Sequence, residues 1–240
     1  MKHLDNVALL AVATTEVEAT VEAIKYSLKE ISFEEVLLIS NINPDPSSKL
    51  YNFIEIEPFR NVSDWGKFIV FDLFRYINTD FIILIHADGF IVNPGKWNKD
   101  FLKYDFIGAP WPLPKDNFSY RDFYGNIIRV GNSVSLRSKK ILELPTKMGL
   151  SWDDAEDSMF HEDGFLTVQN RHLLEREGVK FAPLSIAKYF SKEATIPENK
   201  GIETFLFHQW FGENKNYPCF GSKKNLTQRI FSRLKNLFWQ

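Results

Sequence analysis

The sequence predicts an α/β domain with a mostly parallel central sheet. Three apolar runs, at residues 7–13, 36–39 and 81–85, show no alternation with polar residues. Such runs are typical of strands that are buried on both faces of a parallel sheet. Residues 17–30, between the first two runs, carry apolar side chains at helical spacing. Because strands alternate with helical segments, we expect helices to flank the sheet.

The remaining elements follow from local signals. Ser63 and Asp64 are suited to the start of an apolar helix. Gly178 is suited to end a later helix, at its C′ position. The expected elements after the second strand are a weak strand at 53–56, a helix from 63 to 77, a strand at 81–85, a strand at 127–136, a short helix at 138–144, an acidic loop at 151–163 and a helix at 164–177.

Length and composition exclude several classes of protein. The 240 residues suit one domain, and 44% of them are hydrophobic, enough for a core without disulfide or metal staples. A net charge of −2 argues against a broad nucleic-acid-binding surface. Cys219 stands alone, which rules out an intramolecular disulfide and a multi-cysteine zinc site, and we expect it to be buried. With no signal peptide or membrane span in the first residues, we expect a cytoplasmic protein.

Asp88 is the first candidate for chemistry. It follows the apolar run 81–85 directly, between His86 and Gly89. Ligands of open α/β sheets bind beyond the carboxyl ends of the strands. A carboxylate there can hold Mg²⁺ or Mn²⁺, which would neutralise a diphosphate leaving group. The alternative is a structural role, since Asp-Gly is a common turn sequence.

His161, Glu162 and Asp163 form the second candidate, at the start of the expected helix 164–177. One of the two carboxylates could act as a general base, and the alternative is a structural helix cap. The preceding loop adds four further acids, which we expect to be solvated: Asp153, Asp154, Glu156 and Asp157.

His208 is the third candidate, an imidazole among aromatic residues. A buried structural histidine is one reading, and a ligand that completes a metal site begun by Asp88 is the other. Of the tryptophans, we expect Trp65 to pack in the core, whereas Trp97, Trp111 and Trp210 can pack or bind sugar faces.

Several short blocks follow one another in order along the chain: AVATT (11–15), HADGFIVNP (86–94) with Trp97, FLKYDFIGAPW (101–111), VGNSVSLRS (130–138), ED (162–163), FSKE (190–193) and FH (207–208). In this order they resemble a bacterial and viral family of nucleotide-sugar glycosyltransferases with the GT-A fold. The chain departs from the family pattern in two places. Ser133 and Val134 replace a glycine and an aromatic residue, and His86 stands where a full Asp-x-Asp motif has its first acid.

The resemblance implies a single GT-A-like, Rossmann-like domain that transfers a sugar from a nucleotide-diphosphate donor, with a UDP-sugar favoured, to a glycan hydroxyl. It implies Mn²⁺ or Mg²⁺ as the cofactor, held by Asp88 and His208. Asp163 is the implied base and Glu162 its competitor. The other implied contacts are Thr14 and Thr15 with the nucleotide, Asp88, Gly89, Gly131, Asn132 and Ser133 with the donor, and Gly108 and Trp111 with the acceptor.

We expect a glycosyltransferase domain over residues 1–221, acting in the synthesis of a surface polysaccharide or a related glycan. Two alternatives stay open. One is a carbohydrate-binding or inactive relative. The other is a nucleotidyltransferase, although no glycine-rich phosphate loop with a lysine supports it.

Residues 222–240 have the pattern of a basic amphipathic helix. This tail carries five Lys and Arg residues and no acid, with Leu226, Ile230, Leu234 and Leu237 at helical spacing. Such a helix suits either an anionic membrane, as a peripheral contact that would bring the enzyme to a lipid-linked acceptor, or docking onto the domain or a partner subunit.

The membrane alternative predicts that the full chain sediments with anionic vesicles and that a chain ending at Gly221 does not. The reason is that the tail would supply both the charge and the apolar face. Co-sedimentation of the two proteins measures the difference, and equal sedimentation would rule the membrane contact out.

Overall fold

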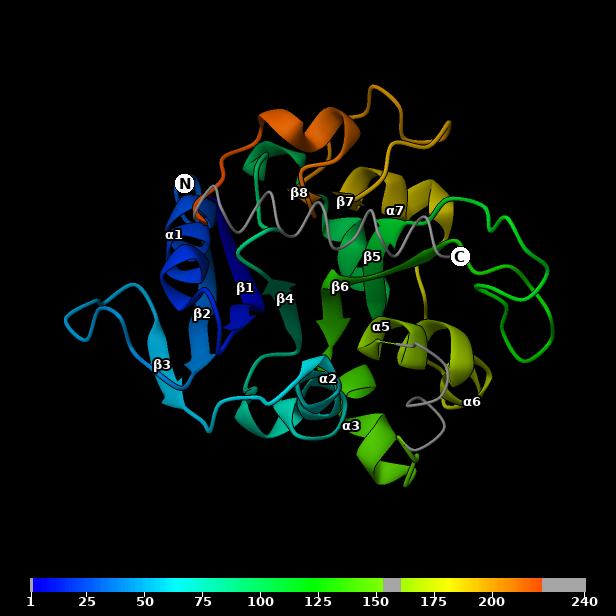
Figure 1. The fold of residues 1–240 in the computed structure, drawn as a ribbon, viewed down its shortest axis with the longest axis horizontal. Coiled ribbons are helices and arrows are strands. Elements are labelled where there is room, and N and C mark those ends of the chain that lie inside the picture. The colour runs from blue at the N-terminus through cyan, green and yellow to red at the C-terminus, as the bar shows by residue number, and fades with distance from the viewer. Residues whose placement is uncertain (1, 153–160, 222–240) are drawn as a thin grey trace.

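The computed structural model describes residues 2–152 and 161–221 of the chain. Their strands and helices form one mixed α/β domain (Figure 1). The strands are β1 (Lys2–Val12), β2 (Ile31–Ser40), β3 (Asn52–Glu55), β4 (Phe81–Ile85), β5 (Phe106–Pro110), β6 (Val130–Ser138), β7 (Ser191–Lys192) and β8 (Leu206–Phe207). The α-helices are α1 (Val17–Ser27), α2 (Val62–Phe71), α3 (Lys139–Lys147), α5 (Glu162–Gly164), α6 (Arg171–Arg176) and α7 (Leu184–Phe190).

The central sheet has six strands in the order β3-β2-β1-β4-β6-β5, which Figure 1 shows from left to right. The pairs β3-β2, β2-β1 and β1-β4 are parallel, whereas β6 is antiparallel to both β4 and β5. The expected mostly parallel sheet is therefore confirmed. Because β1 and β4 are parallel neighbours, the segments that follow them leave the sheet at the same edge.

The two faces of β1 support two separate cores, as expected for a strand with no polar alternation. Leu9 and Ala11 pack in one core with Ile24 of α1 and Phe190 of α7. Leu10 packs in the other, which also contains Ile69 of α2, Leu73 of the 3₁₀ helix Leu73–Tyr76 and Leu142 of α3. Since successive strand side chains point to opposite faces, the continuous apolar run contributes side chains to the cores on both sides of the sheet.

Strand β6 carries a bulge that shapes the site. On β5, Ile107 and Ala109 pair with Leu136 and Gly131, so Gly108 alone lies opposite residues 132–135. The extra residues bend β6 away from its partner, as β-bulges do. Only glycine fits at position 108, because a Cβ there would lie 1.6 Å from the carbonyl oxygen of Gly131.

The structure corrects three sequence predictions. Helix α2 is capped by Asn61, whose side chain accepts a hydrogen bond from the amide of Asp64 at 2.8 Å, whereas Ser63 accepts one from the Trp152 indole. The expected helix 164–177 is broken by a π-helical turn, Phe165–Gln169, that ends at Asn170. Cys219 is exposed, because it lies in the irregular chain after the last 3₁₀ helix.

Other predictions hold or fall outside the described residues. Gly178 has a φ of +76°, which fits its expected C′ position after α6. The acids between 153 and 160 and the tail 222–240 lie outside the described residues, so the boundary at 221 stays a prediction.

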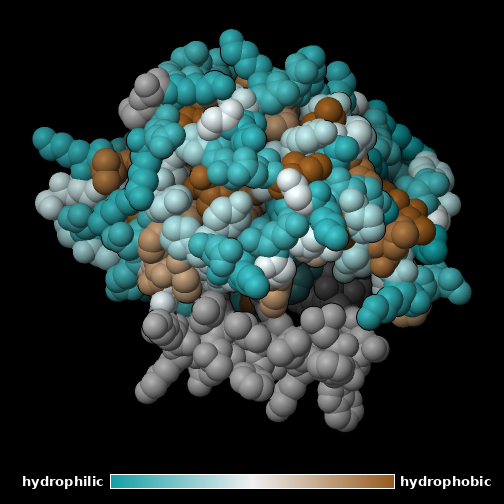
Figure 2. All heavy atoms as spheres, turned by 90° about the horizontal axis from the view of Figure 1, so that it is seen from above, coloured by the Kyte–Doolittle hydropathy of each residue, from teal (hydrophilic) through white to brown (hydrophobic). Residues whose placement is uncertain are grey.

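Within the described ranges no helix is long and apolar enough to cross a membrane. The face in Figure 2 is mainly hydrophilic, with its hydrophobic side chains in separate patches.

Candidate functional site

A cavity of about 770 Å³ opens where β1 and β4 end. Residues after β1, the start of α2, the turn after β4, the β6 bulge, α5 and the segment after β8 all line it. Of the twelve predicted site residues, nine line the cavity: Thr14, Thr15, Asp88, Trp111, Asn132, Ser133, Glu162, Asp163 and His208. The remaining three are glycines that lie behind its wall, at positions 89, 108 and 131.

The three glycines allow close packing. A Cβ at Gly131 would lie 1.9 Å from the Trp111 ring, and one at Gly89 would lie 2.5 Å from Val134. Gly108 faces the β6 bulge in the same way. We find that these positions shape the cavity by letting its wall segments approach each other.

His86, Asp88 and His208 form a cluster in this cavity. One potential ligand atom from each residue lies within 4.8 Å of the others. His208 Nε2 is 3.6 Å from Asp88 Oδ1, and His86 Nδ1 is 4.0 Å from the same oxygen. The amide of Gln209 donates to the Asp88 carbonyl at 2.7 Å, which ties the segment after β8 to the turn after β4. Two imidazoles and a carboxylate are a donor set that suits Mn²⁺.

The protonation of the two histidines differs because of their surroundings. Burial, and then the positive charge of His208, lower the pKa of His86 to about 4, so it is neutral at pH 7. Burial alone would lower the pKa of His208, but hydrogen bonds and charge interactions with Asp88 and Glu193 outweigh it and raise that pKa to about 10.

The neutral imidazole of His86 supports the fit of a cation at this cluster, because a neutral imidazole is the form that binds a metal. The His86 nitrogen measured against Asp88 is Nδ1, whereas Nε2 is buried and has no hydrogen-bond partner among the described residues. For His208 to bind through Nε2 it must release its proton, so a cation and a proton compete for this nitrogen.

Glu193 is a site residue that the sequence analysis missed. Its carboxylate accepts a hydrogen bond from the Asn132 amide at 2.8 Å and lies 3.3 Å from His208 Nδ1. Nδ1 is also 3.0 Å from the Asn132 nitrogen. Because the pKa of His208 is raised to about 10, both of its ring nitrogens carry a proton, so Nδ1 donates to the Glu193 carboxylate and cannot accept from the Asn132 amide. The only signal in the sequence was the position of Glu193 in the block 190–193.

Asn132 connects the histidine cluster to Asp163. Its φ of +97° is strained for a residue with a side chain. This conformation lets its backbone amide donate to Asp163 Oδ2 at 2.8 Å while its side chain reaches Glu193. Its side-chain oxygen accepts from the Val134 amide at 2.9 Å, which fixes the orientation of the group. Strained residues of this kind concentrate at functional sites.

Asp163 and Glu162 are adjacent but differ in surroundings. Burial, followed by the negative charge of Glu162, raises the pKa of Asp163 to about 6. The amides of Asn132 and Gly164 donate to its carboxylate and oppose that rise. Glu162 is fully buried in an ion pair of 2.8 Å with Arg137, which is also fully buried. A carboxylate that titrates near neutral pH in a cavity suits a general base, whereas Glu162 neutralises a buried cation.

The opposite wall of the cavity comes from β1 and α2. Thr14 Oγ accepts from the amide of Phe59 at 3.2 Å, and Trp65 donates its indole N–H to the Val12 carbonyl at 3.0 Å. Trp65 packs in the core as expected, but it also lines the cavity and meets the His86 ring edge-on at 5.4 Å. Trp97 is a core residue, and Trp111 packs against Tyr120 at the cavity wall, with the two rings tilted by 33°.

The cavity is rich in negative charge. Among the described residues that line it, Arg60 is the sole lysine or arginine, and its side chain is 86% exposed and paired with Asp64. The lining carboxylates are Glu16, Asp88, Glu162, Asp163 and Glu193. Arg137 offsets Glu162, and protonated His208 offsets Asp88 and Glu193 in part, so a bound cation would lower the remaining repulsion toward an anionic ligand.

Comparisons with known proteins identify a family and a fold. A family model described as "Protein of unknown function (DUF5672)" matches residues 51–208. The chain is similar to an active-site mutant of LgtC, with a TM-score of 0.51 at 11% identity over 94% of this chain and 95% of that one. It is also similar to the apo form of the glycosyltransferase GlyE of Streptococcus pneumoniae, with a TM-score of 0.48 at 9% identity over 97% of this chain and 64% of that one. No curated protein matches. The similarity to LgtC confirms the expected GT-A-like fold.

The contrast between the two carboxylates predicts opposite effects on stability. Glu162→Gln should lower the free energy of unfolding by about 3–5 kcal/mol, because it leaves the buried charge of Arg137 uncompensated. Asp163→Asn should keep or raise it at pH 7.5. An acid whose folded pKa exceeds its unfolded value destabilises the fold once it ionises.

Urea unfolding at pH 7.5, followed by tryptophan fluorescence, measures both variants. A large loss of stability in Asp163→Asn with none in Glu162→Gln would contradict this assignment. Repeating the Asp163→Asn measurement at pH 4.5 should shrink any gain, since the wild-type carboxyl is then protonated when folded, and the gain should vanish only below the unfolded pKa of about 3.9.

Proposed function

The chain belongs to the DUF5672 family, and we propose that it is a metal-assisted glycosyltransferase that uses a nucleotide-diphosphate sugar. The observation that carries the proposal is the pairing, in one cavity, of a His-Asp-His cluster with a buried carboxylate whose pKa is about 6. Glycosyl transfer needs charge neutralisation at a departing diphosphate and a base for an acceptor hydroxyl. The cluster and Asp163 correspond to these two needs.

In this proposal His86, Asp88 and His208 hold Mn²⁺ or Mg²⁺. When bound, the cation would neutralise the diphosphate and so make it a better leaving group. The excess of lining carboxylates supports the requirement for a cation, since Arg60 is the one lysine or arginine among the described residues that line the cavity. His86 is a third ligand that the sequence analysis did not include.

Asp163 acts as the base in its ionised form, if the reaction inverts the anomeric centre. The acceptor oxygen attacks the anomeric carbon, its proton passes to an Asp163 oxygen, and the bond from that carbon to the diphosphate oxygen breaks. The leaving nucleoside diphosphate keeps the electron pair. The amides of Asn132 and Gly164 hold the carboxylate in place, and Glu162 contributes a nearby charge that raises its basicity.

The remaining contacts follow the placement of the lining residues. We propose that Thr14 and Thr15, after β1, bind the nucleotide, which we expect to be a uridine diphosphate. Asn132 and Ser133 are proposed to contact the donor sugar and Trp111 the acceptor sugar, and all of these residues line the cavity. The acceptor is proposed to be a glycan hydroxyl of a surface polysaccharide or related glycan, with a lipid-linked form if the tail contacts a membrane.

A thermal-shift screen tests the function. UDP, GDP, dTDP and CMP, and their sugar forms, are added to the full chain with and without Mn²⁺. A ligand that binds only the folded state raises its melting temperature, so we expect a shift for one nucleotide that depends on Mn²⁺. Asp88→Ala should abolish the shift, and the exposed Asp100→Asn serves as its control. Failure of every nucleotide would contradict the proposal and favour a glycan-binding or inactive protein.

The pKa of Asp163 predicts a pH profile for the reaction. With the donor that the screen identifies, kcat/KM should rise between pH 5 and 7 with a midpoint near 6, because the base works only when ionised. Asp163→Asn should lose about 10²–10⁴-fold in turnover while staying folded. A variant that keeps full activity would exclude Asp163 as the base.

A further inference from the structure

His208 and Glu193 each stand just beyond the end of a short strand. The strands β7 and β8 pair in parallel, with Ser191 opposite Leu206 and Lys192 opposite Phe207. The backbone amide of His208 donates to the Lys192 carbonyl at 2.9 Å. With only two residues each, these strands supply few hydrogen bonds of their own. The positions of Glu193 and His208, which follow the strand ends, therefore need further support.

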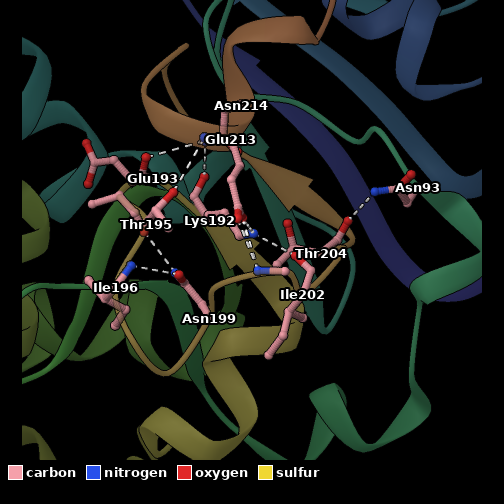
Figure 3. Close-up of polar contacts among 12 residues, drawn as sticks. Asn93, Lys192, Glu193, Thr195, Ile196, Asn199, Ile202, Thr204, Glu213 and Asn214 are labelled. Carbon is pink, nitrogen blue, oxygen red and sulfur yellow. Dashed lines mark hydrogen bonds and ion pairs between the residues drawn. The ribbon is translucent and has the colours of Figure 1, made fainter.

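One buried side chain lies between the two strand ends. Asn214, 1% exposed, lies in the 3₁₀ helix Gly212–Asn216, and Figure 3 shows its amide pointing at the segment of Lys192 and Glu193. Its Nδ2 donates toward the carbonyl oxygens of Lys192 at 2.8 Å and Glu193 at 3.4 Å. It also reaches the carbonyl oxygens of His208 at 3.3 Å and Gln209 at 3.1 Å.

The helix that carries Asn214 is attached to the same segment. Glu213 pairs with the ammonium of Lys192, whose side chain is 5% exposed, and accepts from the amide of Gly201 at 3.1 Å (Figure 3). Because Gln209 in turn donates to the Asp88 carbonyl, the amide of Asn214 is linked to both segments that carry the cluster. A single buried amide among four carbonyl oxygens has little freedom to move.

We propose that Asn214 is a positioning residue for the metal site, one that fixes where β7 and β8 place Glu193 and His208. The inference rests on the proposed function, because it concerns the same cluster. Groups of this kind orient a ligand without touching the metal, and their loss lowers metal affinity. Alanine would leave four carbonyl dipoles converging on a space without a donor.

The test is calorimetric titration of the full chain with Mn²⁺ alone. We expect Asn214→Ala to raise the dissociation constant about 10–100-fold, and His208→Ala to abolish binding. Asn199→Ala is the matched control. Asn199 is also buried and hydrogen-bonded to backbone, at Ala194 and Ile196. It is a strict control, because Ala194 follows Glu193 directly, whereas the four carbonyl oxygens of the cluster segments are bound by Asn214. Its dissociation constant should stay within about twofold of the wild-type value.

A spectroscopic measurement separates positioning from general stability. In the Co²⁺-loaded protein, the visible absorption band of the metal should change in Asn214→Ala and stay the same in Asn199→Ala. This difference is expected even if the melting temperatures of both variants fall by the same amount. If Asn214→Ala does not fold, Asn214→Ser replaces it, since its shorter side chain cannot reach both strands.

Two outcomes overturn the inference, and they are distinguishable. Wild-type affinity and an unchanged band in the Asn214 variant would refute it while leaving the metal site intact. Failure of the wild-type chain to bind Mn²⁺ or Co²⁺ would refute it together with the metal site of the proposed function.

Discussion

The hydrogen bonds of Asn132 join the two chemical halves of the cavity. Its backbone amide holds Asp163, and its side chain holds Glu193 beside His208. This double contact requires a φ of +97°, and the local strain is offset by the hydrogen bonds that the conformation allows. The geometry of the candidate base and that of the candidate metal ligands therefore depend on one residue.

That conformation is available because β6 bulges at residues 132–135. The bulge is accommodated by Gly108 on the neighbouring strand and by Gly131, which lets Trp111 pack directly against the backbone. These glycines serve the site without contributing a functional group. A side chain at these positions would clash with the neighbouring strand or ring. Their role is therefore steric, although they stand in the blocks that resemble a glycosyltransferase family.

Electrostatics connects the same residues to a charged ligand. The buried ion pair with Arg137 neutralises the Glu162 carboxylate, while the neighbouring Asp163 has its pKa raised to about 6. On the other side of Asn132, His208 lies between Asp88 and Glu193 and carries the positive charge that balances them. A cation at this cluster would take over that role, which links the site to an anionic, diphosphate-containing donor.

The sequence by itself determined the parallel part of the sheet, since runs such as 81–85 have no polar alternation. It also singled out Asp88 at the end of an apolar run, Asp163 at the start of an expected helix and His208 among aromatic residues. It could not distinguish Glu162 from Asp163, because adjacent acids differ only in the partners that the fold supplies. Glu193, His86 and Asn214 were beyond its reach for the same reason. Their roles depend on distances between segments far apart in the chain. They also depend on a bulge and a pair of two-residue strands, which are too short to be predicted from local sequence patterns. Only the tertiary structure decided these, because burial and contact across the cavity set the charge and the hydrogen-bond partners of each group.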